Sequence, residues 1–226
     1  LGGSLSYDQW FRGNASIFGG LEWRISNING LNLKLEYDPF NYLDSDYLEP
    51  LTSLQLQESE HLLLANIDQQ KMALYNQGKS VKTYVMSSSK QPPSCTENSL
   101  GTPWGLHRIC EKIGQGEREG MVFEGRLPIG LTAEECDRKK QFRNLITSRI
   151  LRLEGLEEGV NRGGVLDTFG RFVYIHGTNH EGNLGSPASS GCLQLSNLNV
   201  IELFGEVSVG AHLYIQKNFS KLSQKT

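Results

Sequence analysis

The sequence predicts a mainly β protein with one helix near its C-terminal end. Short runs that alternate apolar and polar residues recur along the chain between glycine and asparagine turns, which is typical of antiparallel strands. The stretch 196–207 departs from this alternation, because Leu198, Ile201 and Phe204 recur at helical spacing and Ser196 is placed as the N-cap. We therefore expect a β-sandwich or open barrel in which a helix follows Cys192.

The first 57 residues differ in pattern from the rest. Segments 15–26 and 31–38 alternate apolar and polar residues on either side of an Asn-Gly pair, which predicts a β-hairpin. The stretch 41–60 is polar and acidic, contains a proline, and predicts a linker. We therefore expect a hairpin appendage with an acidic linker over residues 1–57 and a second domain over residues 58–226.

The second domain is predicted to be a series of strands. Three short strands joined by tight turns open it, a proline- and glycine-rich loop leads into a fourth, and a hairpin and a buried strand follow. A charged stretch between the hairpin and the buried strand predicts a short helix or loop. A strand that ends near His176 and a closing strand complete the domain. In chain order the ranges are 61–70, 71–79, 80–89, 95–109, 120–130, 132–143, 145–156, 165–177 and 211–216.

Composition limits the class of protein. The chain has 226 residues, of which 38% are hydrophobic, and a formal net charge of −3. Acidic residues slightly outnumber lysine and arginine, which form no dense cluster, so we expect no nucleic-acid partner. No run approaches the ~18 apolar residues that a membrane-spanning helix needs, so we expect no transmembrane helix. The chain starts at Leu1 without a signal peptide, and we interpret it as a processed or truncated piece.

The cysteines do not have the spacing of a structural metal site. None of the four belongs to a CxxC pair, so we expect no structural zinc. One interpretation is that Cys95 and Cys110 form a disulfide in an oxidising compartment. The other interpretation is three ordinary thiols and one functional thiol. The four are Cys95, Cys110, Cys136 and Cys192.

The stretch 174–197 leads from His176 to Cys192 through a glycine-rich loop. A cysteine nucleophile needs a neighbouring group that holds its thiolate, and a histidine at a strand end can be that group. The Ser190 and Gly191 backbone offers N–H donors for an oxyanion, and the following helix would turn its positive end toward the sulfur. The same residues also fit a buried structural cysteine, or a metal site with His180, which the irregular loop disfavours.

These residues resemble the signature of YkuD-type L,D-transpeptidase catalytic domains. That signature has a strand-end His-Gly-Thr, a later glycine, and Ser-x-Gly-Cys followed by an aliphatic residue. The resemblance extends over roughly residues 60–216 and includes the family's Thr-Pro-x-Gly loop. The matching positions are Thr102, Pro103, Gly105, His176, Gly177, Thr178, Gly185, Ser189, Ser190, Gly191, Cys192 and Leu193.

The resemblance implies a cysteine acyltransferase that needs no cofactor and no metal. Cys192 would attack the carbonyl of an L,D peptide bond in a peptidoglycan stem tetrapeptide, the terminal D-alanine would leave, and a thioester acyl-enzyme would form. His176 would hold and move protons, with its second ring nitrogen oriented by the Gly177 carbonyl. The residues implied to bind the oxyanion or substrate are Ser189, Ser190, Gly191, Thr178 and Gln194.

Two positions depart from the family's usual pattern. Ser190 stands where the family often has histidine, and Gln194 stands where it usually has arginine. A backbone N–H at position 190 survives any side chain, so the oxyanion donors are unaffected. Loss of the arginine replaces a charge-assisted contact with a neutral one, which bears on substrate preference and efficiency.

The implied partners are peptidoglycan stem peptides and, in one form of the reaction, an anchored lipoprotein. The implied location is the periplasm or cell envelope, and the family makes the protein a carbapenem target. Two alternatives stay open: an L,D-carboxypeptidase that uses water as acceptor, and a non-catalytic wall-binding module, against which His176 and Cys192 argue. The segment 19–38 resembles strands of an outer-membrane β-barrel protein of the YjbH exopolysaccharide type.

Overall fold

The structure, a computed structural model, describes residues 21–24, 32–35 and 45–216. The chain divides into two compact units, residues 1–41 with 220–226 and residues 42–219. In the first unit, β1 (Leu21–Arg24) pairs antiparallel with β2 (Asn32–Leu35). The predicted strand pairing is therefore confirmed, while the predicted turn at Asn29 and Gly30 lies outside the described residues.

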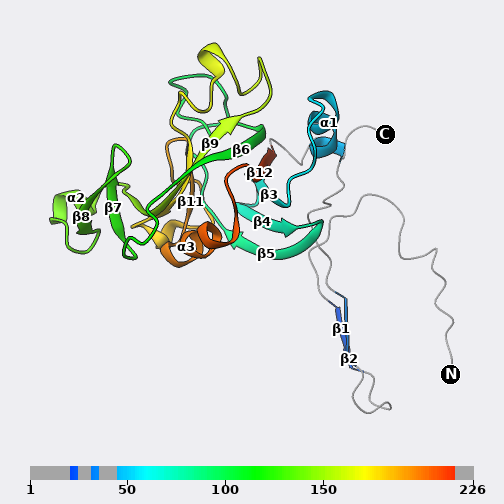
Figure 1. Ribbon diagram of the computed structural model, residues 1–226. Helices are drawn as coiled ribbons and strands as arrows, with labels where there is room; N and C mark the ends of the chain where they lie inside the picture. The colour runs from blue at the N-terminus through cyan, green and yellow to red at the C-terminus, as the bar shows by residue number, and fades with distance from the viewer. Residues whose placement is uncertain (1–20, 25–31, 36–44, 217–226) are drawn as a thin grey trace. The chain divides into compact units, whose positions relative to one another are not determined.

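The second unit is built on one curled ten-stranded sheet (Figure 1). Its main path runs β11-β10-β9-β6-β12-β3-β4-β5, and the β7–β8 hairpin joins it at β9. The mainly β class predicted from the sequence is confirmed. The strands are β3 (His61–Asn66), β4 (Lys71–Asn76), β5 (Lys79–Val85), β6 (Gly105–Ile113), β7 (Met121–Glu124), β8 (Leu127–Thr132), β9 (Ile146–Gly155), β10 (Tyr174–Thr178), β11 (Leu193–Leu195) and β12 (His212–Gln216).

Strand β12 lies in the middle of this sheet, between β3 and β6. It runs parallel to β3, where His212 is opposite Leu62, and antiparallel to β6, where Leu213 is opposite His107. The strands β3, β4 and β5 form one side of the sheet, and β6, β9, β10 and β11 form the other. The last strand of the unit therefore joins two parts that come from separate stretches of sequence.

Helix α3 (Asn197–Glu206) lies against strands β9 and β10 (Figure 1). Its N-cap Ser196 accepts a hydrogen bond from the Asn199 backbone N–H at 3.2 Å, as predicted. Val200, Leu203 and Phe204 are buried in the main apolar cluster, which includes side chains from both parts of the sheet. Each such side chain contributes about 1.5–3 kcal/mol by burial, so α3 fixes the chain that follows Cys192.

The linker predicted over residues 41–60 contains a helix, α1 (Ser45–Ser53). Tyr47 and Leu51 lie four residues apart and share one helix face, and they are only 1% and 3% exposed. The Tyr47 hydroxyl lies 3.3 Å from Nδ1 of His212, on β12. The prediction of a linker is wrong at these residues, because two apolar side chains at helical spacing dock a helix whose other positions are mostly polar.

Two further elements differ from the prediction near the histidine and the cysteine. The strand expected over 165–177 begins only at Tyr174, after a 3₁₀ turn at Gly164–Leu166 and further turns. The residues directly after Cys192 form β11, a strand that was not predicted, and α3 then begins after its predicted N-cap Ser196. The charged stretch at 132–143 contains α2 (Arg138–Gln141), as predicted.

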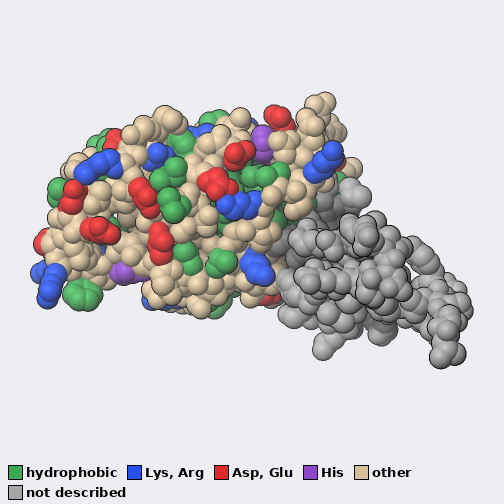
Figure 2. All heavy atoms as spheres, turned by 90° about the horizontal axis from the view of Figure 1, so that it is seen from below, with side chains coloured by type: hydrophobic (Ala, Val, Ile, Leu, Met, Phe, Trp, Pro, Cys, Tyr) green, Lys and Arg blue, Asp and Glu red, His purple; other side chains and the backbone are tan. Residues whose placement is uncertain are grey.

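Charges of both signs are mixed on the surface. Figure 2 shows one face on which acidic and basic side chains are interspersed. Lys82 on β5 and Glu202 on α3 form an exposed ion pair at 2.6 Å. Within the described ranges, no helix is both long and apolar enough to cross a membrane.

Candidate active site

His176 lies in β10, between β9 and β11, and is 3% exposed. Its Nδ1 lies 2.7 Å from the carbonyl oxygen of Gly177, the partner predicted from the sequence. Burial lowers the pKa of His176 to about 4, so the ring is neutral at neutral pH. A neutral ring that donates from Nδ1 leaves Nε2 without a proton, and Nε2 is therefore able to accept one.

Cys192 lies directly before β11, which pairs in parallel with β10. Ile175 is opposite Leu193 and His176 is opposite Gln194. Cys192 is two residues before Gln194, the residue opposite His176. Since side chains alternate along a strand, Cys192 lies on the same face of the sheet as His176. The structure therefore brings together the two residues that the sequence predicted as a pair.

The Cys192 thiol is neutral in the resting protein. Burial raises the pKa of the thiol to about 11, although the Tyr174 backbone N–H and the charge of Arg171 act in the opposite direction. Sγ lies 3.7 Å from the Phe172 carbonyl oxygen, to which a protonated thiol can donate. The pKa shifts of the two groups thus favour a thiol and a neutral imidazole as the starting state of the pair. Because β11 separates the cysteine from α3, the start of that helix is not adjacent to the sulfur.

The turn before Cys192 is held by Ser189. The Ser189 hydroxyl donates to the Cys192 carbonyl oxygen at 2.6 Å and accepts from the Gly191 N–H at 3.2 Å. Gly191 has a φ of 126°, which strongly favours glycine. Ser190, Gly191 and Cys192 all line a cavity of about 270 Å³, so the residues predicted to supply the oxyanion donors lie at one cavity with the cysteine.

Gly177 and Asn197 support the histidine from the side of β9. A Cβ at Gly177 would lie 2.7 Å from the Thr147 carbonyl oxygen, so no other residue fits there without a shift. The Asn197 side-chain oxygen accepts hydrogen bonds from Thr147 Oγ1 at 2.6 Å and Ser148 Oγ at 2.5 Å. The Asn197 amide donates to the Thr178 carbonyl oxygen at 3.2 Å. Asn197 thus ties β9, the end of β10 and the start of α3 together, a role the sequence did not indicate.

Thr178 and Gln194 meet at Asn144. The Thr178 hydroxyl donates to Asn144 Oδ1 at 3.3 Å, and the Gln194 amide donates to the same oxygen at 2.7 Å. Gln194 is only 2% exposed. Its side chain is therefore part of the packing around β11.

Further residues of the cavity were not predicted from the sequence. Arg171 donates to the carbonyl oxygens of Ser94 at 2.9 Å and Gly101 at 2.7 Å, and so holds a neighbouring loop beside the thiol. Leu100 and Phe172 also line the cavity, together with Glu97, Asn98, Gly170 and Val173. They lie outside the strands and helices, and residues 170–173 fall in a segment that was predicted to be a strand, so the sequence did not assign them to the site.

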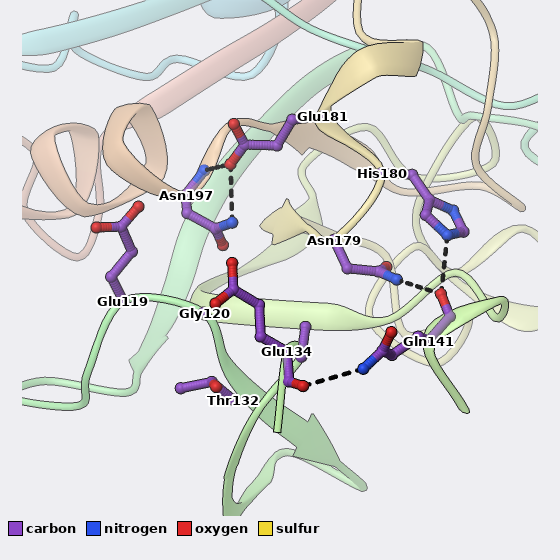
Figure 3. Close-up of a pocket in the computed structure, with 10 residues that line it drawn as sticks. Glu119, Gly120, Thr132, Glu134, Gln141, Asn179, His180, Glu181 and Asn197 are labelled. Atoms are coloured by element: carbon purple, nitrogen blue, oxygen red, sulfur yellow. Dashed lines mark hydrogen bonds between the residues drawn. The ribbon is translucent and has the colours of Figure 1, made fainter. Parts of the chain in front are cut away.

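A second, larger cavity of about 620 Å³ lies beyond the C-terminal ends of β10 and β11 (Figure 3). Its lining includes Glu119, Glu134 and Glu181 but neither His176 nor Cys192. His180 faces it, with Nε2 at 3.0 Å from the Gln141 carbonyl oxygen. His180 and Cys192 therefore line different cavities, and the part of the chain that the structure describes contains no cluster of three or more potential metal-ligating side chains.

All four cysteines are free thiols. Cys95 Sγ lies 3.8 Å from the Trp104 carbonyl oxygen, and Cys110 Sγ lies 3.4 Å from the Arg152 carbonyl oxygen. The disulfide that the sequence left open between Cys95 and Cys110 is not formed.

The fold defines a mainly β domain in which His176 on β10 and Cys192, directly before the neighbouring strand β11, lie on one face of the sheet. The chain belongs to the YkuD family of L,D-transpeptidase catalytic domains, whose family model matches residues 60–215. The resemblance seen in the sequence is confirmed. Residues 1–61 also match the family model of YjbH, described as an exopolysaccharide biosynthesis protein.

Individual relatives are partial matches. "Putative L,D-transpeptidase YqjB" of Bacillus subtilis is 42% identical over 104 residues, which are 46% of this chain and 56% of that protein. An L,D-transpeptidase structure from Mycobacterium smegmatis is 22% identical, with a TM-score of 0.42 over 70% of this chain and 58% of that one. L,D-transpeptidase 3 of Mycobacterium tuberculosis, solved with a faropenem-derived adduct, is 16% identical, with a TM-score of 0.44 over 70% and 60%. The chain therefore spans less than two thirds of each of these proteins.

Proposed function

We propose that the protein is a peptidoglycan L,D-transpeptidase that uses Cys192 as nucleophile and His176 as acid–base group. The observation that carries the proposal is the parallel pairing of β10 and β11, which puts both side chains on one face in a chain of this family. The cavity of about 270 Å³ beside Cys192 supports it, because an acyl donor needs access to the sulfur.

The proposed reaction starts from the neutral pair. As the sulfur of Cys192 attacks the carbonyl carbon of the L,D peptide bond, its proton moves to Nε2 of His176. The carbonyl oxygen becomes an oxyanion, which the backbone N–H groups of Ser190, Gly191 and Cys192 stabilise. For the Gly191 N–H, the oxyanion replaces Ser189 Oγ as acceptor. The carbon–nitrogen bond then breaks, His176 returns the proton to the departing amine of D-alanine, and a thioester remains.

The second half of the reaction runs in the reverse direction. An amine of another stem peptide attacks the thioester carbon, His176 accepts the proton of that amine, and the Cys192 sulfur leaves and regains a proton. With water in place of the amine, the same steps give an L,D-carboxypeptidase. Incubation with purified tetrapeptide muropeptides and mass analysis distinguishes the outcomes. Dimers mean transpeptidation, and tripeptides alone mean hydrolysis. The absence of both products would contradict an enzyme of this class.

The nucleophile is tested by covalent labelling with a carbapenem, followed by intact mass. Cys192→Ala should abolish the adduct, because the family's cysteine is the group that such lactams acylate. Cys136→Ala is the matched control, since Cys136 is buried outside the cavity. Labelling of Cys192→Ala at the wild-type rate would assign the nucleophile to another residue.

The proposed substrate sets the proposed location and partners. Stem peptides of peptidoglycan lie outside the cytoplasmic membrane, so we propose that the protein works in the periplasm or cell envelope. Fractionation of cells that express the full-length protein tests this proposal, with recovery in the cytoplasmic fraction as the contradicting result.

A further inference from the structure

Strand β9 contains a bulge beside His176. The register between β9 and β10 shifts between His176 and Gly177, so that Ser148 and Arg149 of β9 have no opposite residue on β10. Bulges interrupt a sheet and re-aim the neighbouring side chains, and they are frequent next to active sites. This one falls at Gly177, whose carbonyl oxygen orients the histidine ring.

Ser148 adopts a backbone conformation that favours glycine. Its φ is 62°, in the left-handed region, and its side chain is fully buried. Backbone stability alone would favour glycine here, because glycine reaches this conformation without strain. Strained residues cluster at active sites, where the strain accompanies a task. The hydroxyl is the feature that distinguishes Ser148 from an unstrained glycine, so the task is to be sought in its contacts.

The Ser148 hydroxyl joins the bulge to two other segments. It accepts a hydrogen bond from the N–H of Gly120, directly before β7, at 2.9 Å and donates to Asn197 Oδ1 at 2.5 Å. The Asn197 amide donates in turn to the carbonyl oxygen of Thr178, two residues after His176 on β10. The bulge is thus tied both to the β7–β8 hairpin and to the strand that carries the histidine.

The bulge and Asn197 enclose Gly177. A Cβ at Gly177 would lie 2.7 Å from the Thr147 carbonyl oxygen and 2.8 Å from Asn197 Oδ1. The Asn197 oxygen is the acceptor of the Ser148 hydroxyl, so this hydrogen bond helps to fix an atom against which Gly177 packs. Arg149 donates to the Ser148 carbonyl oxygen at 2.6 Å and so also holds the bulge. Gly177 therefore has little freedom to move its carbonyl oxygen away from the histidine ring.

We infer that Ser148 is a positioning residue for the proposed reaction: its hydroxyl fixes the β9 bulge, and the bulge holds the Gly177 carbonyl oxygen at Nδ1 of His176. This inference rests on the proposed function. While Nδ1 donates to that carbonyl, Nε2 is free to accept the proton of Cys192. Without the hydroxyl, the bulge loses its links to Gly120 and Asn197, the carbonyl oxygen gains freedom to move, and the ring is no longer held in one orientation and tautomer.

The first measurement is nitrogen NMR of the His176 ring in the full chain. In wild type the ring proton should lie on Nδ1. Ser148→Ala and Ser148→Gly should both shift the two ring-nitrogen signals toward those of a mixture of tautomers, because the acceptor at Nδ1 is no longer fixed. Ser148→Gly also relieves the backbone and should be the more stable of the two variants. A change that appears in both variants is therefore not a consequence of lost stability.

The second measurement is the rate at which a carbapenem acylates Cys192, followed by intact mass. Both Ser148 variants should react about 10- to 100-fold more slowly than wild type, since a displaced acid–base group costs rate in this range. A wild-type protein that the carbapenem does not acylate would contradict the proposed function, whereas the ring signals report on Ser148 without any reaction.

Ser59→Ala is the matched control. The Ser59 hydroxyl likewise accepts from a backbone N–H, that of His212 at 3.0 Å, and donates to a backbone oxygen, that of His61, on another part of the sheet. Its loss should lower the melting temperature but leave the His176 ring signals and the acylation rate unchanged.

The inference is overturned if the Ser148 variants keep the wild-type ring signals, whether or not the acylation rate falls, because Ser148 then does not act through His176. Changed ring signals with a wild-type rate also overturn it, since the orientation of the ring would not govern the reaction. Equal changes in Ser59→Ala would mean a general loosening of the sheet and would overturn it as well.

Discussion

The Nδ1 atom of His176 lies 2.7 Å from the carbonyl oxygen of the next residue, Gly177. The register between β9 and β10 shifts at this pair of residues. Gly177 thus does two things at one position: its carbonyl orients the ring, and its missing side chain allows β9 to approach. The histidine is held by backbone, so its orientation does not depend on a second titratable side chain.

The acid limb of the pH–rate profile should report His176. Because burial lowers the pKa of His176 to about 4, the ring remains able to accept a proton until the pH falls to that value. Protonation below it removes the base, so the rate of carbapenem acylation should fall as pH falls, with a midpoint near 4. Acylation rates from intact mass between about pH 3 and 8 measure this. A midpoint between about 6 and 7 would mean that the working ring is more exposed than β10 allows.

Asn197→Ala should destabilise the protein. The fully buried hydroxyls of Thr147 and Ser148 both donate to Asn197, and each lost acceptor costs about 1–3 kcal/mol. Thermal or denaturant unfolding measures the loss. Glu181 Oε1 accepts hydrogen bonds from the backbone N–H and the side-chain amide of Asn197. Asn197→Asp keeps the acceptor for the two hydroxyls but places a carboxylate beside Glu181, so its stability should recover as pH falls.

The control for Asn197 is Asn199→Ala, two residues along in the same helix. Alanine is the better helix former, so Asn199→Ala should leave the stability unchanged or raise it. If Asn199→Ala costs as much as Asn197→Ala, the loss does not come from the buried hydroxyls.

Gln194→Arg should lower both the melting temperature and the acylation rate. Gln194 is 2% exposed and its amide donates to Asn144, so a longer cation overpacks the site at a cost of about 1–3 kcal/mol. Gln194→Met keeps the volume and should lose only the hydrogen bond, about 0.5–1.5 kcal/mol. If Gln194→Arg instead raised the acylation rate and left the melting temperature unchanged, the result would support a substrate-binding role for the family's usual arginine.

Two truncations should behave differently. The catalytic domain is proposed from the sequence to begin at residue 58, but α1 packs on it from residue 45. Removal of residues 1–41 should leave the melting temperature of the second unit unchanged. Removal of residues 1–57 also deletes Tyr47 and Leu51, whose burial contributes about 1.5–3 kcal/mol each. Equal melting temperatures of the two truncated proteins would show that α1 does not stabilise the second unit. Tyr47→Ala in the full chain tests the same contact by itself.

Local patterns in the sequence predicted most strands of the second unit. Short apolar runs between turns mark strands such as β3 and β9, and helical spacing with a capping serine marks α3, because these signals lie within a few neighbouring residues. The His176–Cys192 pair was also predictable, since a strand-end histidine and a glycine-rich loop are both visible in the chain. The His-Gly-Thr and Ser-x-Gly-Cys motifs then indicated the family.

The surroundings of that pair were not predictable in the same way. Asn197 and Asn144 act through hydrogen bonds to segments about 50 residues away, and Leu100 and Phe172 reach the cavity from two loops. Such contacts depend on how the sheet curls, and no local pattern in the sequence predicts them. Helix α1 was missed for a similar reason, because its two apolar residues become a signal only when their partner surface on β12 is known.

The position of β12 has a consequence for the order of events during folding. Residues 61–85 and 105–195 cannot share one sheet until residues 212–216 are inserted between them. A chain emerging from the ribosome therefore cannot complete this unit until its last strand is available. Because closure of such long loops is slow, the two partial sheets are expected to expose unpaired edges in the meantime. His176 and Cys192 both lie in the stretch 105–195, so strands β10 and β11 can pair before β12 is added.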